Sequence, residues 1–202
     1  GFGAAPGMPG AALKIDFPDL DSYLARLSSS ARKDMRRKLR AASALRIERR
    51  VEICDVRNEV LALYRQTLMH ANLTFEELTA EYFEGVLRTE DCRASCTLYF
   101  ENEKLLAANL LLENDDVLLD KFFCMAPEGR RLNLYFVSWF ENIRYCLKRG
   151  IRTYYSGQAG YKNKVRLGSE LKGASMYFQH RNPLINLGLR AAAPLLSDDL
   201  HV

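Results

Sequence analysis

The sequence predicts a mixed α/β (α+β) fold in which helices flank a mostly antiparallel central sheet. Two observations carry this prediction. Three strand-like segments follow one another over residues 95–125 with short polar turns between them, and segments of helical periodicity lie on both sides. Of the 202 residues, 48% are hydrophobic and 27% are charged, as in an average globular chain. This composition excludes collagen-like, coiled-coil and wholly disordered chains, and no apolar run reaches the roughly 18 residues of a spanning helix.

The first 50 residues divide into two predicted parts. Residues 1–16 are rich in Gly, Ala and Pro and show little periodicity, so we expect a linker or a cloning remnant there. Residues 17–50 are expected to hold a basic amphipathic helix, which Ser28–Ser30 would cap. Residues 26–50 contain ten Lys or Arg against two Asp or Glu, whereas the remainder has 19 basic and 23 acidic residues. This asymmetry indicates either an anionic partner or a solvated helix.

The next elements follow from their periodicity. Residues 51–56 alternate apolar and polar side chains, which predicts a short strand. Residues 58–71 carry a helical stripe, and Thr74 with Glu77 forms the capping box of a further helix that extends to Leu87. We then expect a meander of three strands, at 95–101, 105–112 and 117–125.

The second half of the chain alternates helices and strands. Residues 132–149 form the most regular helical stripe, and Gly150 follows as its C-cap. The later expected elements are a strand at 151–156, a short basic helix at 160–168, a strand at 174–180 and a terminal helix at 184–196. The helix at 132–149 joins the strands at 117–125 and 151–156. These two strands are therefore expected to be parallel, with a right-handed crossover.

The five cysteines and three histidines form no metal-binding pattern. Cys92 and Cys96 are four residues apart, no CxxC pair occurs, and no histidine lies near them. Scattered cysteines at apolar positions are typical of a reducing compartment. We therefore expect a cytoplasmic protein without a metal.

The order of elements from Val51 onward resembles the GNAT superfamily of N-acyltransferases. The basic stretch Ser28–Arg40 and the later Ser156–Gly168 are similar to its Fem-type branch, which includes peptidoglycan-bridge aminoacyltransferases. The resemblance covers roughly Phe17 to His180. It implies that residues 51–202 form the acyltransferase domain, and that the chain corresponds to the second of two GNAT halves. A missing N-terminal half, or a homodimer, would then complete the protein.

The resemblance also implies an acyl-CoA co-substrate such as acetyl-CoA. Its pyrophosphate would lie on the turn before the 132–149 helix, where a helix N-terminus offers free N–H groups to phosphate. The implied cofactor-binding residues are Gly129, Arg130, Arg131, Leu132 and Asn133. Only one glycine of the superfamily's Gln/Arg-x-x-Gly-x-Gly/Ala loop is present, because Arg131 or Leu132 occupies the second small position. An ordinary strand–turn–helix connection is the alternative.

Transfer of an acyl group to an amine needs a proton acceptor and stabilisation of an oxyanion. Asp120 stands in an apolar strand, where it is either a base with a raised pKa or a residue of the solvent face. By resemblance, Tyr161 is the candidate that protonates the departing thiolate. Tyr155, Gly157 and Lys162 are the expected substrate-binding residues, although a lysine such as Lys162 is more often a solvated surface residue.

The expected function is therefore transfer of an acyl group from acyl-CoA, or another activated carrier, by direct attack of an amine. The acceptor would be a small molecule or a cell-wall precursor. Two alternatives stay open: a Fem-type transferase that uses aminoacyl-tRNA, and a non-catalytic basic module that binds nucleic acid or anionic lipid on a degenerate GNAT scaffold.

Overall fold

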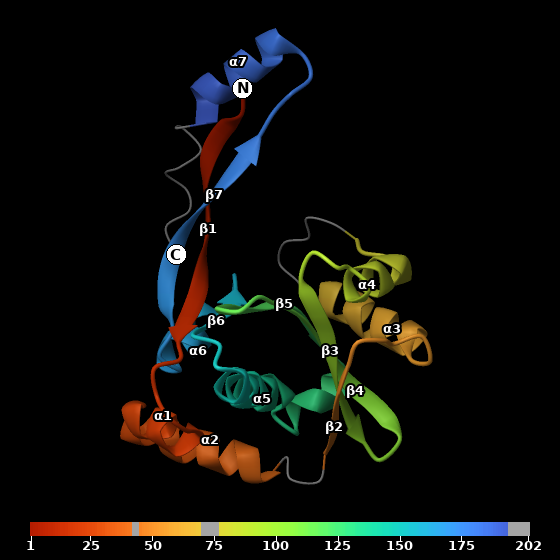
Figure 1. The fold of residues 1–202 in the computed structure, drawn as a ribbon, viewed down its shortest axis with the longest axis vertical. Helices are drawn as coiled ribbons and strands as arrows, with labels where there is room; N and C mark the ends of the chain where they lie inside the picture. Colours follow the sequence, from red (N-terminus) through yellow and green to blue (C-terminus); the bar gives the residue numbers. More distant parts are fainter. Residues whose placement is uncertain (42–44, 70–76, 194–202) are drawn as a thin grey trace.

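The computed structural model describes residues 1–41, 45–69 and 77–193, and its central feature is one seven-stranded sheet (Figure 1). The strands are β1 (Gly3–Lys14), β2 (Arg46–Arg50), β3 (Arg93–Glu101), β4 (Lys104–Glu113), β5 (Val117–Met125), β6 (Thr153–Gly157) and β7 (Glu170–Phe178). The helices are α1 (Leu20–Arg26), α2 (Ser29–Ala41), α3 (Arg57–Leu68), α4 (Ala80–Leu87), α5 (Leu134–Arg149), α6 (Tyr161–Arg166) and α7 (Pro183–Ala192), with a 3₁₀ turn at Pro127–Arg130.

The strand order in the sheet is β2-β3-β4-β5-β6-β1-β7. All neighbours are antiparallel except β5 and β6, which are parallel and are connected through α5. This confirms the predicted mixed, mostly antiparallel sheet, its meander β3–β4–β5 and the parallel crossover. Gly150 ends α5 in the left-handed conformation (φ 73°), as its position in the sequence predicts.

Two hydrophobic clusters hold the layers together. On one face of the sheet, α3 and α4 pack through residues such as Tyr64 and Phe83. On the other face, α1, α2 and α5 pack around Trp139 and Phe140 (Figure 1). The buried Tyr23 hydroxyl accepts a hydrogen bond from Trp139 Nε1 at 3.0 Å and donates to the Leu167 carbonyl at 2.7 Å. This chain of bonds ties α1 to α5 and to the end of α6.

The linker prediction for residues 1–16 is wrong for most of that segment. Gly3–Lys14 is strand β1, and it pairs with β6 on one side and β7 on the other. Its small residues permit close approach rather than flexibility. A Cβ atom on Gly10 would lie 1.5 Å from the Tyr155 hydroxyl, so this side chain crosses the strand where only glycine leaves room.

The basic segment 17–50 holds two helices and a strand instead of one helix. Asp19 caps α1 by accepting from the Ser22 amide at 2.7 Å, and the chain leaves helical geometry at Leu27 before α2 begins. The strand expected at 51–56 lies earlier, as β2. It forms the sheet edge, where its alternating charges pair with one another, as between Arg50 and Glu48.

Other boundaries shift by a few residues. The capping box at Thr74 lies outside the described residues, and α4 begins only at Ala80, where the Thr79 side chain accepts from the Tyr82 amide. Strand β7 starts at Glu170 rather than at residue 174, because its pairing with β1 already begins there, where Glu170 lies opposite Ala12. In the described part of the chain, no helix has both the length and the apolar composition needed to cross a membrane.

Candidate functional site

Strands β5 and β6 separate soon after they begin, and a cavity opens where they part. Their parallel pairing covers only Val117–Leu119 with Thr153–Tyr155. Beyond it, Leu111 pairs with Asp120 and Leu110 with Phe122, so Lys121 is an extra residue that makes a β-bulge. The cavity measures about 300 Å³ and is lined by residues that include Asp120, Phe123, Tyr135, Tyr154, Gly157 and Lys164. This volume lies at the small end of ligand pockets.

Asp120 is the acidic group of this cavity. Its Oδ2 accepts hydrogen bonds from the Tyr154 hydroxyl at 2.8 Å and from the side-chain amides of Asn109 and Asn142, both at 3.4 Å. Burial raises the pKa of Asp120 from 3.8 to about 6, although the Tyr154 hydrogen bond acts in the opposite direction. A carboxylate with this pKa is ionised at neutral pH and accepts a proton more readily than an exposed one.

Two polar side chains of α5 face the same region. The Asn142 amide also donates to the Tyr154 hydroxyl at 3.1 Å, which orients that hydroxyl toward Asp120. The hydroxyl oxygen of Tyr135 is buried and has no hydrogen-bond partner among the described residues. Because Tyr135 lines the cavity, this hydroxyl is available to a bound molecule.

Lys164 supplies the positive charge of the cavity. Its Nζ donates to the backbone carbonyls of Ser156 at 2.5 Å, Gly157 at 3.2 Å and Gln158 at 2.9 Å. Burial lowers the pKa of Lys164 to about 8, while the charge of Asp120 raises it. The ammonium group therefore holds the loop between β6 and α6 in place and adds a positive potential beside Asp120.

The cavity thus combines a carboxylate, an ammonium group and a free hydroxyl at the separation of two parallel strands. A family model described as an acetyltransferase (GNAT) domain matches residues 29–164. The chain belongs to this GNAT family. No curated protein matches the sequence.

Solved structures support the same fold for this GNAT domain. The C-terminal domain of a lysylphosphatidylglycerol synthetase from Agrobacterium fabrum is similar over 100% of the chain at 14% identity, with a TM-score of 0.65. A structure titled FemX is similar over 89% of the chain (14% identity, TM-score 0.68), and L-PGS from Bacillus licheniformis over 96% (11% identity, TM-score 0.61). The chain corresponds to 68%, 63% and 67% of those three chains respectively. At these identities the likeness concerns the fold alone.

The GNAT domain brings two of the predicted site residues together. Asp120 and Gly157 both line the cavity. Gly157 has a φ of 71°, the left-handed region that glycine enters without strain, and its carbonyl faces Lys164. Asp120 is half-buried rather than on an open solvent face, because its Oδ2 accepts hydrogen bonds from Tyr154, Asn109 and Asn142.

The other predicted catalytic and substrate-binding residues lie outside the cavity lining. The Tyr161 hydroxyl donates to the Pro9 carbonyl at 2.8 Å, so it is engaged with strand β1. The Tyr155 side chain crosses over Gly10. Lys162 is exposed on α6, two residues before the buried Lys164.

The predicted cofactor loop, Gly129–Asn133, leads into α5 as expected, but its charges are partly paired. Arg131 forms an ion pair with Glu101, and the adjacent Glu128 pairs with Lys104 at 2.8 Å. Asn133 adopts a left-handed conformation at the N-cap of α5 without a side-chain capping bond. The loop therefore presents backbone at a helix N-terminus, with much of its arginine charge already compensated.

Sequence reasoning missed Lys164, Tyr135, Asn109 and Asn142. A usable signal exists for the two asparagines: Asn109 interrupts an apolar strand, and Asn142 stands eight residues after Leu134 on the buried stripe of α5. Buried polar residues at such positions need partners, and here both donate to Asp120.

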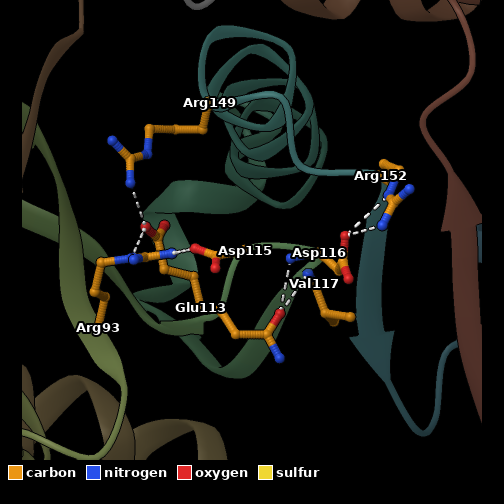
Figure 2. Close-up of polar contacts among 8 residues, drawn as sticks. Arg93, Glu113, Asp115, Asp116, Val117, Arg149 and Arg152 are labelled. Atoms are coloured by element: carbon orange, nitrogen blue, oxygen red, sulfur yellow. Dashed lines mark hydrogen bonds and ion pairs between the residues drawn. The ribbon is translucent and has the colours of Figure 1, made fainter.

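A second, more open cavity of about 890 Å³ lies beside the β4–β5 turn, lined by residues of β2, β3, β4 and α5. Four of its charged groups form ion pairs with one another. Figure 2 shows Arg93 between Glu113, at 3.0 Å, and Asp115, at 2.7 Å, with Arg149 3.4 Å from Glu113. These pairs fix the turn to β3 and to α5.

Proposed function

We propose that this GNAT domain transfers an acyl group to an amine, with Asp120 as the proton acceptor. The observation that carries the proposal is the half-buried Asp120 carboxylate in the lining of the cavity between the separating strands, whose pKa is raised to about 6. A base of this kind accepts a proton from an amine as the amine becomes bonded to a carbonyl carbon. Burial and the three side-chain donors around Oδ2 hold it in one orientation.

The reaction would proceed by direct attack. The amine nitrogen forms a bond to the acyl carbon, and the carbonyl oxygen becomes an oxyanion. Asp120 takes the proton that the nitrogen releases. The bond between the acyl carbon and the oxygen or sulfur of the donor then breaks, the carbonyl re-forms, and the leaving group recovers a proton from the Asp120 carboxyl group.

Tyr135 and Lys164 have separate parts in this proposal. The unpartnered Tyr135 hydroxyl is the group that would donate a hydrogen bond to the oxyanion. The three N–H bonds of Lys164 are already directed at backbone carbonyls, so its contribution is electrostatic. Its positive charge stabilises negative charge that develops in the cavity, and it fixes the Gly157 loop.

The donor that these features favour is an aminoacyl ester of tRNA. The loop before α5 has already paired Arg131 with Glu101, which leaves less charge for the pyrophosphate of coenzyme A. Helix α2 carries six basic residues and one acidic residue, Asp34, and a polyanion would be attracted to it. The Fem-type resemblance implies the same donor.

Acyl-CoA is the second candidate, and one observation favours it. The N-terminus of the 16-residue helix α5 lacks a side-chain cap at Asn133, and the Phe136 and Val137 amides donate only to the Asn133 carbonyl, so no side chain of Asn133 competes with a bound anion there. Such a terminus binds phosphate in other folds.

The experiment measures thermal unfolding with aminoacyl-tRNA, acetyl-CoA and free coenzyme A, followed by mass-spectrometric detection of acyl transfer to a panel of amines. We expect protection by aminoacyl-tRNA, lost in the double variant Arg36→Glu/Arg37→Glu, and acyl transfer that is lost in Asp120→Asn. Protection by coenzyme A that the double variant retains would instead favour acyl-CoA. Absence of protection and of transfer with every donor contradicts the proposal.

A further inference from the structure

Helix α7 has its apolar face turned away from the protein. Leu184, Ile185, Leu187 and Leu189 are 80%, 48%, 64% and 44% exposed, while the only buried side chain that α7 itself contributes is the polar Asn186. An amphipathic helix of a globular protein normally shows the reverse arrangement. We call these four exposed residues the α7 patch.

The inverted orientation is fixed by hydrogen bonds. The Asn186 amide donates to the Gly1 carbonyl at 3.0 Å, and its side-chain oxygen accepts from the His180 amide at 2.9 Å. The aliphatic stem of Arg190, one turn further on, lies so close to β1 that a Cβ on Gly3 would come within 2.8 Å of its Cγ, although the residue as a whole is exposed. The narrow polar side of α7 therefore faces the arm, and the broad apolar side faces outward.

The position of α7 allows a flat partner to reach it. The outer halves of β1 and β7 form a two-stranded arm, and α7 lies at the far end of this arm, away from the helices that cover the sheet (Figure 1). The patch is a convex helix surface rather than a groove. A contiguous exposed apolar surface of this kind marks an interaction site.

The charge around the patch selects among partners. Arg181 precedes α7 and Arg190 lies within it, and residues 173–193 contain no Asp or Glu. Pairing of two copies through α7 would bring these like charges together, whereas an anionic surface would be attracted. Leucine and isoleucine beside arginine match the composition of helices that lie in the headgroup region of an anionic bilayer.

We propose that α7 docks this domain on the surface of a membrane rich in anionic phospholipid. The α7 patch enters the boundary between headgroups and acyl chains, and the neighbouring cations contact lipid phosphates. The arm holds the rest of the domain away from the bilayer. This docking is independent of the acyl-transfer proposal, since it uses none of the residues around Asp120.

Vesicle sedimentation tests the proposal with the chain as it is. We expect binding to vesicles of phosphatidylglycerol and phosphatidylcholine, weaker binding to phosphatidylcholine alone, and a decrease as salt rises from 50 to 500 mM, since screening weakens the charge contribution over a Debye length of roughly 10 Å at 0.1 M. Leu184→Ser/Leu187→Ser should reduce binding at least about tenfold, consistent with about 0.8 kcal/mol for each methylene removed from the apolar phase.

The matched control is Val51→Ser/Met69→Ser, which removes two apolar side chains of similar exposure, 64% and 74%, far from α7. It should bind vesicles like the unchanged chain, and all variants should unfold at the same temperature because the replaced side chains are exposed. Equal binding to neutral and anionic vesicles, or undiminished binding of the α7 variant, overturns the proposal. A third outcome also overturns it: the unchanged chain binds no vesicles but self-associates in sedimentation velocity, and the α7 variant abolishes that self-association.

Discussion

The hydroxyl of Tyr154 lies 2.8 Å from Oδ2 of Asp120, and it joins β6 to β5 at the point where the two strands separate. The pair is enclosed on the α5 side by Asn142, which donates to both partners. Burial makes the Asp120 carboxylate expensive to keep ionised and raises its pKa, whereas the hydrogen bond from Tyr154 favours the charged form and partly offsets that rise.

Replacement of Asp120 by Asn should stabilise the fold at pH 8 and abolish acyl transfer. The folded state prefers the protonated carboxyl group, because its pKa rises from 3.8 to about 6. Stability is therefore lost as pH rises through this interval, by up to about 3 kcal/mol, and a neutral side chain avoids the loss. Urea unfolding at pH 8 and at pH 4 should show the gain at the higher pH only.

The matched control for that gain is Asp55→Asn. Asp55 is exposed, and its hydrogen bond with Arg50 lowers its pKa, so its replacement should give no stabilisation at pH 8. Equal gains in both variants would mean that the effect is a general response to net charge. Full acyl transfer by Asp120→Asn would remove Asp120 from the mechanism, whereas a fall of about 10²–10⁴ is the size expected for a lost general base.

Replacement of Tyr154 by Phe should raise the pKa of Asp120 further. The Tyr154 hydrogen bond favours the carboxylate and is the largest influence that lowers this pKa. Without it, the acid limb of the pH–rate profile should move to higher pH. The midpoint at which the Asp120 carboxyl carbon titrates in NMR should move in the same direction. Tyr155→Phe is the control, because that hydroxyl lies against Gly10 instead. A downward movement in Tyr154→Phe would show that the phenol does not stabilise the charge.

Replacement of Lys164 by Met should destabilise the domain and loosen the loop after β6. Three backbone carbonyls would lose their donor, and one unsatisfied buried acceptor already costs about 1–3 kcal/mol. Urea unfolding measures the loss. Lys162→Met, on the exposed side of the same helix, should change the free energy of unfolding by less than about 0.5 kcal/mol. Equal effects of the two variants would show that the carbonyl contacts contribute nothing.

The sequence predicted best those elements whose evidence is local. The meander β3–β4–β5 alternates apolar residues with polar turns, and α5 repeats its stripe from Leu134 to Gly150, so both were found nearly at their observed bounds. Strand β1 was missed because its partners lie far along the chain, as in the pairing of Ala11 with Gly157. Its Gly and Ala content suggested flexibility, whereas those residues fit beneath the Tyr155 side chain.

The site was predictable to the same limited extent. Asp120 was singled out as a carboxylate inside an apolar strand, either a base or a residue of the solvent face, and the structure shows it half-buried in the lining of the cavity. Which of Lys162 and Lys164 reaches the cavity depends on how α6 is rotated over the carbonyls of Ser156, Gly157 and Gln158. Because α6 is only six residues long, its sequence shows no apolar stripe from which that rotation could be predicted. Tyr161, expected from resemblance, faces Pro9 of the strand that the sequence did not predict.

Replacement of Gly10 by Ala should weaken the attachment of β1 to the sheet. The new Cβ would lie 1.5 Å from the Tyr155 hydroxyl and 2.1 Å from its Cζ, so the ring must move and the β1–β6 pairing must adjust. Overpacking of this kind costs about 1–3 kcal/mol, measurable by urea unfolding. Gly85→Ala is the control, because a Cβ there meets nothing within 4 Å on helix α4 and should stabilise by up to about 1 kcal/mol. Two outcomes would show that the contact between Tyr155 and Gly10 does not limit the packing of β1. One is an unchanged free energy of unfolding in Gly10→Ala, and the other is a double variant Gly10→Ala/Tyr155→Ala that is no more stable than Gly10→Ala alone.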